Sequence, residues 1–168
     1  MGLSIYAECE EDFLEDYALI ATKVGETVLK HFSCPFDVQL SLFIVGEEAI
    51  RTANHECRGL DKVTDVLSFP NLPFTPGNVA AFAEIREGDA DLFDPDSGEL
   101  ILGDIMICAP KVYAQAEEYG HGALREYAFL LAHSLLHLLG FDHEAEEDRL
   151  RMEELQEELL KEAGYERI

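Results

Sequence analysis

Three histidines toward the C-terminus have the residue type and spacing of metal ligands. His133, His137 and His143 lie in the segment HSLLHLLGFDH, which has the form HxxxHxxGxxH. Residues four apart in a helix share one face, with Cβ atoms about 5–6 Å apart, so two imidazole nitrogens can reach one zinc ion. In a random sequence of this composition, the chance that a given histidine is followed by two His and one Gly at these offsets is about one in ten thousand. The pattern therefore predicts one metal site.

The residues that follow the second histidine indicate how a third ligand would arrive. Gly140 stands where helices commonly end in a left-handed residue, a conformation that is costly for any residue with a Cβ atom. The chain can then turn back and bring His143 to the same ion. Asp142 is expected to orient a histidine or the turn, and a fourth metal ligand is the alternative for this residue. Three neutral ligands leave a fourth position for water, whose pKa zinc lowers to about 7, whereas structural zinc usually has four protein ligands. We therefore expect one catalytic zinc ion.

The residue after the first histidine argues against a peptidase. Zinc peptidases with this spacing carry a glutamate there as the general base, and this chain has Ser134. A hydroxyl group does not take up the proton of an attacking water at neutral pH. A metallopeptidase or amidase on the same scaffold remains the second hypothesis.

The helices and strands that the sequence predicts indicate an α+β fold. Steps of three and four between apolar residues predict helices, and alternation or continuous apolar runs predict strands. The predicted helices span 11–31, 47–57, a segment from Pro110, 124–139 and 145–163, and the predicted strands span 38–45, 66–70 and 100–108. Residues 71–98 are rich in Pro, Gly and Asp and predict a long surface excursion, with a weak strand near 79–85. Helices that lead into a few strands and then helices again predict a small mixed sheet.

Length and cysteine content indicate one intracellular domain. The chain has 168 residues, nearly half of them apolar, which suits a single domain over residues 1–168. The four cysteines include no CxxC pair, which suits reduced and mostly buried thiols. The longest apolar stretch, 127–141, is too short to cross a bilayer, and the N-terminus lacks the pattern of a signal peptide. We therefore expect a cytoplasmic protein with no membrane partner.

The charge balance is strongly acidic. There are 35 acidic residues against 12 basic ones, a formal net charge of −23. A field of that sign repels phosphate-rich partners at long range, which counts against nucleic acid as a ligand. Arg51, Arg58 and Lys62 nevertheless lie close together in the sequence. They can form a local cationic patch on an acidic molecule.

Three segments resemble a known family. HSLLHLLGFDHE, RGLDKVTDVLSFP and LGDIMIC together resemble the YbeY family of bacterial metallo-endoribonucleases, and the resemblance spans most of the chain. It implies a single compact α+β domain with about five helices and a zincin-like metal site on a central helix. It also implies zinc on His133, His137 and His143 and a catalytic arginine at Arg58. Two departures are Ser134, where the family usually has Gly, and an acidic stretch around 89–96 that looks like an extension of a family loop.

The implied activity is cleavage of single-stranded RNA, in 16S rRNA 3′-end maturation and ribosome quality control. The expected partners are therefore single-stranded RNA or rRNA and the ribosome or its proteins, with no DNA, and the expected state is a monomer. Zinc would polarise a phosphoryl oxygen, while Arg58, which is always charged, would grip two phosphate oxygens. A surface or turn-capping arginine is the alternative for Arg58. A non-catalytic ribosome-associated factor is the third hypothesis for the whole protein.

Asp65, Asp104 and Asn54 are weaker candidates for contact with the substrate or for orienting the ligands. Both aspartates adjoin apolar strand residues, and a buried carboxylate is costly unless it is paired, with Arg58 or a ligand histidine as the candidate partner. Strand-end or turn aspartates are the alternative. Asn54 lies one helical turn before Arg58 and either shares its surface or caps the helix. Cys57 is expected to be a buried, unreactive thiol.

Overall fold

A four-stranded mixed sheet is the layer on which the rest of the chain packs. The computed structural model describes residues 2–142 and 145–165. The strands are β1 (Leu3–Cys9), β2 (Val38–Val45), β3 (Val66–Pro70) and β4 (Leu100–Cys108), in the order β1-β2-β4-β3. β1, β2 and β4 run parallel, and β3 pairs antiparallel with β4. The predicted mixed sheet is confirmed.

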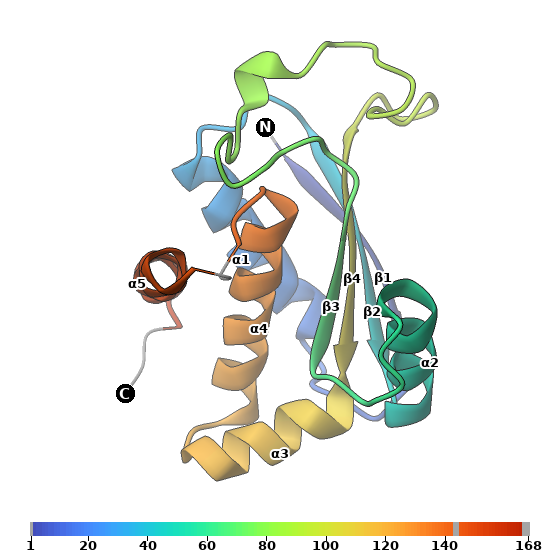
Figure 1. Ribbon diagram of the computed structural model, residues 1–168, viewed down its shortest axis with the longest axis vertical. Helices are drawn as coiled ribbons and strands as arrows, with labels where there is room; N and C mark the ends of the chain where they lie inside the picture. The colour runs from blue at the N-terminus through green and yellow to red at the C-terminus, as the bar shows by residue number, and fades with distance from the viewer. Residues whose placement is uncertain (1, 143–144, 166–168) are drawn as a thin grey trace.

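Five α-helices accompany the sheet in the described part of the chain. They are α1 (Tyr17–His31), α2 (Glu47–Arg58), α3 (Ala109–Tyr119), α4 (Ala123–Leu138) and α5 (Glu146–Ala163). In Figure 1, α1, α4 and α5 lie on one side of the sheet and α2 lies on the other. The α+β class and the number of helices agree with the sequence analysis, and none of the described helices is long and apolar enough to cross a membrane.

The main core lies between the sheet and α4. Val38, Leu40, Leu42 and Ile44 alternate along β2 and are at most 1% exposed. α4 buries most of its side chains, as expected of a helix that is apolar on nearly every side. His133 and His137 are only half-buried on this helix. They therefore mark the part of α4 that the core leaves open.

The structure differs from the predicted elements at three places. β1 was not predicted, because its apolar residues are only half-buried and are interrupted by Ser4, Tyr6 and Glu8. The first helix begins at Tyr17 and not at residue 11, because the preceding turn packs the Phe13 ring against three tyrosine rings. The weak strand near 79–85 is instead a 3-10 helix, Phe82–Glu84.

The segment between β3 and β4 is the predicted long excursion. In Figure 1 it arches over the end of α4. The Ala80 N–H donates to the Leu139 carbonyl (2.9 Å), and the rings of Phe74 and Phe82 meet edge to face at 5.4 Å. The excursion therefore covers the end of the helix that carries the two histidines.

Candidate metal centre and catalytic cleft

His133 and His137 converge from successive turns of α4. Their Nε2 atoms lie 3.0 Å apart, and their rings meet at 78° with centroids 4.5 Å apart. Two nitrogen ligands at about 2.0–2.1 Å from a tetrahedral zinc ion would lie about 3.3 Å apart. The two imidazoles therefore fit a shared ion, and their donor type suits zinc among the first-row metals.

The backbone after α4 orients His137. The Nδ1 atom of His137 lies 3.0 Å from the Phe141 carbonyl oxygen. Because a carbonyl only accepts hydrogen bonds, Nδ1 must carry the proton, which leaves the Nε2 lone pair of a neutral imidazole available to a metal. The same link between a backbone carbonyl and a ligand histidine is common in metal sites.

Gly140 makes this turn possible. Its φ is +101°, and a Cβ atom there would lie 2.8 Å from Phe74 Cβ and 2.9 Å from the Thr75 nitrogen. The Phe141 N–H then donates to the Leu136 carbonyl (3.0 Å), so the chain doubles back beside the helix. His143 lies outside the described residues, and its place as the third ligand remains a prediction.

The histidines open into a cleft of about 680 Å³ that also contains Arg58. Its lining includes β3, the end of α2 with Arg58, and the end of α4 with the turn that follows. The candidate residues that line it are His133, His137, Asp142, Arg58 and Asp65. Arg58 is the last residue of α2, which ends at Gly59 in the left-handed conformation (φ +70°), and its side chain is exposed. The structure thus brings a cation and two imidazoles into one cleft.

A hydrogen-bonded network holds Asp65 at the edge of this cleft. Gln115 Nε2 on α3 donates to Asp65 Oδ2 (3.3 Å) and to Glu126 Oε2 on α4 (3.0 Å). Glu126 is 3% exposed, and its other oxygen lies 2.8 Å from His121 Nε2. The network joins α3 and α4 to the segment before β3. Sequence analysis missed it, although a glutamate within a largely apolar helix was an available signal.

Two other candidates lie away from the cleft lining. Asn54 is fully buried, and its Nδ2 donates to the Lys62 carbonyl (2.9 Å), so it supports the turn that follows Arg58. Asp104 is exposed and pairs in register with Ser41, on the opposite face of β4 from the buried Ile105. Asp104 is therefore not the buried, paired carboxylate that its apolar neighbours suggested as one possibility, and the structure does not bring it together with the histidines.

Cys57 and Ser134 lie beside the candidate site, one exposed and one buried. Cys57 is exposed and lines the cleft, so the prediction of a buried thiol was wrong; Cys9 is also exposed, and only Cys108 is fully buried. Ser134 is completely buried, and its hydroxyl group pairs with that of Ser68 on β3. This bond ties the helix of the histidines to β3, which lines the cleft, at the position where zinc peptidases carry their general base.

Comparison with known proteins places the chain in a family. The sequence profile described as endoribonuclease YbeY matches residues 5–164. The endoribonuclease YbeY of Lachnospira eligens is 42% identical over 169 residues, which cover 99% of this chain and all of that protein. The endoribonuclease YbeY of Clostridium acetobutylicum is 43% identical over 82% of both chains.

A solved structure agrees with the fold. The solution structure of TM1509 from Thermotoga maritima superposes with a TM-score of 0.52 at 22% identity, and the match covers 95% of this chain and 91% of that one. This likeness supports the α+β architecture alone. Because the family profile and the curated relatives both span nearly the whole sequence, the chain belongs to the YbeY endoribonuclease family.

Proposed function

We propose that this protein is a zinc-dependent endoribonuclease that cleaves single-stranded RNA in 16S rRNA 3′-end maturation and ribosome quality control. Membership of an endoribonuclease family that is metal-dependent supports the reaction class. The single structural observation that carries the proposal is the convergence of two histidine Nε2 atoms in the cleft that also holds Arg58. Ribosomal partners and a monomeric state belong to the same proposal.

His133, His137 and His143 would hold the zinc ion. When bound, it supplies a Lewis acid for a phosphoryl oxygen and a means of lowering the pKa of water. The hydrogen bond between His137 Nδ1 and the Phe141 carbonyl keeps the ring in the tautomer that a ligand needs. Asp142, which lines the cleft beside this turn, is proposed to orient the metal-binding segment.

Arg58 is proposed to bind the scissile phosphate. Its guanidinium stays charged at every physiological pH and can donate two parallel hydrogen bonds to phosphate oxygens. Charge that develops on those oxygens in the transition state would be stabilised by the same contact. The bond from Asn54 to the Lys62 carbonyl fixes the turn after Arg58, and Asp65 is proposed to contact the substrate at the cleft edge. Asp104 has no part in this proposal.

An assay of RNA cleavage with arginine variants tests the proposal. Arg58→Ala should lower kcat/KM for a single-stranded oligonucleotide by about 10²–10³-fold, the usual effect of removing a charge-stabilising donor. Arg58→Lys should recover only part of the loss, because an ammonium cannot grip two oxygens at once. Arg51→Ala is the matched control, since Arg51 lies on the same helix but pairs with Asp61 (2.8 Å). It should stay within a few-fold of the unmodified protein.

The same assay separates the competing hypotheses. Unstructured peptides should remain intact under conditions in which RNA is cut. Cleavage of peptide with RNA left whole would favour a peptidase or amidase. Metal-dependent RNA binding without turnover would favour a non-catalytic ribosome-associated factor.

A further inference from the structure

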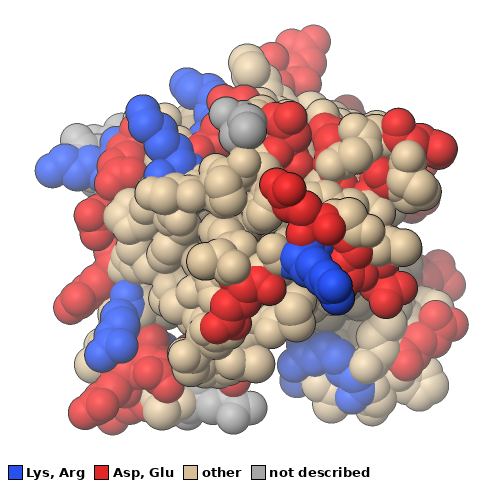
Figure 2. Space-filling model, turned by 90° about the horizontal axis from the view of Figure 1, so that it is seen from above, with Lys and Arg blue, Asp and Glu red and all other residues tan. Residues whose placement is uncertain are grey.

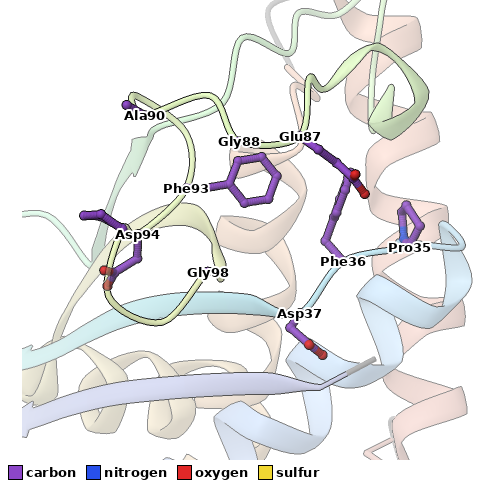
Figure 3. Close-up of a pocket in the computed structure, with 10 residues that line it drawn as sticks. Pro35, Phe36, Asp37, Glu87, Gly88, Ala90, Phe93, Asp94 and Gly98 are labelled. Atoms are coloured by element: carbon purple, nitrogen blue, oxygen red, sulfur yellow. The ribbon is translucent and has the colours of Figure 1, made fainter.

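A second cavity lies between the turn that follows α1 and the acidic part of the excursion. It has a volume of about 500 Å³ and shares no lining residue with the histidine cleft. Figure 3 shows its lining side chains, which come from residues 35–37 on one side and 87–98 on the other. Neither the metal site nor Arg58 contributes to it.

Two phenylalanines form an apolar wall of this cavity. The rings of Phe36 and Phe93 meet nearly edge to face, with centroids 5.4 Å apart and an interplanar angle of 77°. Both side chains are half-buried, and both pack against the main core. The wall is therefore anchored to the fold although the excursion itself is irregular. Aromatic rings offer a negative face to a cation and an apolar surface to an aliphatic chain.

The charged residues of the cavity are all acidic. Asp37, Glu87 and Asp94 line it, and among the described residues no Lys, Arg or His does. The Gly2 N–H donates to Asp37 Oδ1 (2.9 Å) and the Asp96 N–H donates to Asp94 Oδ1 (2.9 Å). These bonds orient two carboxylates and leave each with acceptor capacity for a further donor. Figure 3 shows the Glu87 side chain beside Phe36.

An aromatic wall with carboxylates around it selects a cation with an apolar stem. A phosphate or carboxylate ligand would meet three like charges, and a wholly apolar ligand would remove water from the carboxylates without replacing it. Arginine and lysine side chains have the matching form, because an aliphatic stem carries a charged head. We propose that this cavity docks an arginine or lysine side chain of a basic protein segment.

The charge of the whole molecule supports a protein partner of that kind. The net charge of −23 attracts basic proteins at long range and speeds their encounter. In Figure 2 acidic side chains spread over the face seen from above, with fewer basic ones between them. This inference goes beyond the proposed RNA cleavage and does not depend on it, because the cavity and the cleft are lined by different residues.

Binding of a labelled peptide tests the proposal. The probe is a short arginine-containing peptide in a glycine and serine background, followed by fluorescence anisotropy at low salt. The matched peptide carries citrulline in place of each arginine and should not bind. In two-dimensional NMR spectra, the arginine peptide should move the backbone amide signals of Gly88 and Gly98, which line the cavity. Shifts confined to residues outside the cavity would overturn the proposal.

Variants distinguish binding of the peptide in the cavity from its attraction by the overall negative charge of the protein. Glu87→Gln combined with Asp94→Asn keeps the side-chain shapes and should weaken peptide binding about tenfold, the effect of losing charge-assisted contacts. Asp12→Asn combined with Glu15→Gln removes the same charge from exposed positions outside the cavity and should weaken it less than twofold. Equal losses in both double variants would overturn the proposal. Phe93→Leu, which keeps the wall apolar but removes the ring, should weaken binding and leave RNA cleavage unchanged.

A small polyamine is the competing ligand. Spermidine carries several positive charges but no peptide chain. Displacement of the labelled peptide should need a large excess of spermidine. Displacement at a concentration equal to that of the peptide would contradict docking of a protein segment and favour a polyamine site.

Discussion

The Gln115 side chain connects two carboxylates that come from different parts of the chain. Its amide group donates to Asp65 before β3 and to the buried Glu126 on α4. A buried carboxylate depends on such donors, because the free energy of removing it from water is otherwise uncompensated. Gln115 therefore stabilises the packing of α3 on α4 and, at the same time, holds Asp65 at the cleft.

Replacement of Gln115 by leucine should lower both stability and activity. Glu126 would keep His121 as a partner but lose its amide donor, so the free energy of unfolding should fall by about 1–3 kcal/mol. Denaturation with urea measures this change, and the RNA assay should show reduced kcat because Asp65 loses its support. Glu118→Leu, at an exposed position on the same helix, is the control and should change stability by less than about 0.5 kcal/mol. Unchanged stability in Gln115→Leu would contradict this role.

Spacing within one helix made the histidine pair predictable, whereas the sequence signal of this network was a single glutamate, Glu126, within a largely apolar helix. His133 and His137 lie four residues apart, a spacing that places both on one face of a helix and that can be seen in the sequence itself. Gln115, Glu126 and Asp65 meet only because two helices pack against the segment before β3. Asp104 shows the converse error. Its apolar neighbours suggested burial, but side chains alternate across a strand, and that of Asp104 points to the exposed face.

The strands and helices with strong sequence patterns were predictable, and those with weak patterns were not. β2 agrees with its predicted range because four core side chains alternate along it. β1 was missed because it lies at the edge of the sheet, where half-burial tolerates polar residues. The start of α1 depends on aromatic contacts of Phe13 that no local pattern reveals.

The turn at the end of α4 depends on Gly140. Gly140→Ala should destabilise the protein by about 2–4 kcal/mol, because the left-handed backbone is strained and the new Cβ atom meets the Phe74 and Thr75 backbone region. Gly120→Ala is the matched control, since Gly120 also has positive φ (+70°) but nothing within 4 Å of the added Cβ atom. It should cost only about 1–2 kcal/mol. Thermal unfolding measures both, and equal losses would contradict the close packing of the excursion on Gly140.

The whole molecule combines an acidic surface with a phosphate-containing substrate. The long-range field opposes the approach of RNA, whereas Arg58 in the cleft attracts a phosphate at short range. Salt screens the long-range repulsion of RNA more than the short-range attraction of a phosphate to Arg58, because the distant charges interact through water. The response of this protein to ionic strength should therefore differ from that of basic RNA-binding proteins.

Salt dependence of RNA cleavage tests this balance. Between low and moderate salt, kcat/KM for a single-stranded oligonucleotide should stay level or rise, as screening reduces repulsion between the two acidic partners. A protein that neutralises many phosphates instead loses affinity steeply over the same range. A steep fall in kcat/KM would contradict a net repulsion between this protein and RNA and would indicate an extended cationic surface.

Measuring the metal content of purified variants together with RNA cleavage tests whether α4 carries a catalytic metal centre. The unmodified protein should carry about one zinc ion per chain, and His137→Ala should lose both the ion and cleavage while its circular dichroism spectrum stays unchanged. His31→Ala is the control, because His31 lies with Glu158 and Glu162 in an exposed group that also has metal-ligand chemistry. That variant should keep both the ion and the activity. Stoichiometric zinc and full cleavage in His137→Ala would contradict a catalytic metal centre on α4.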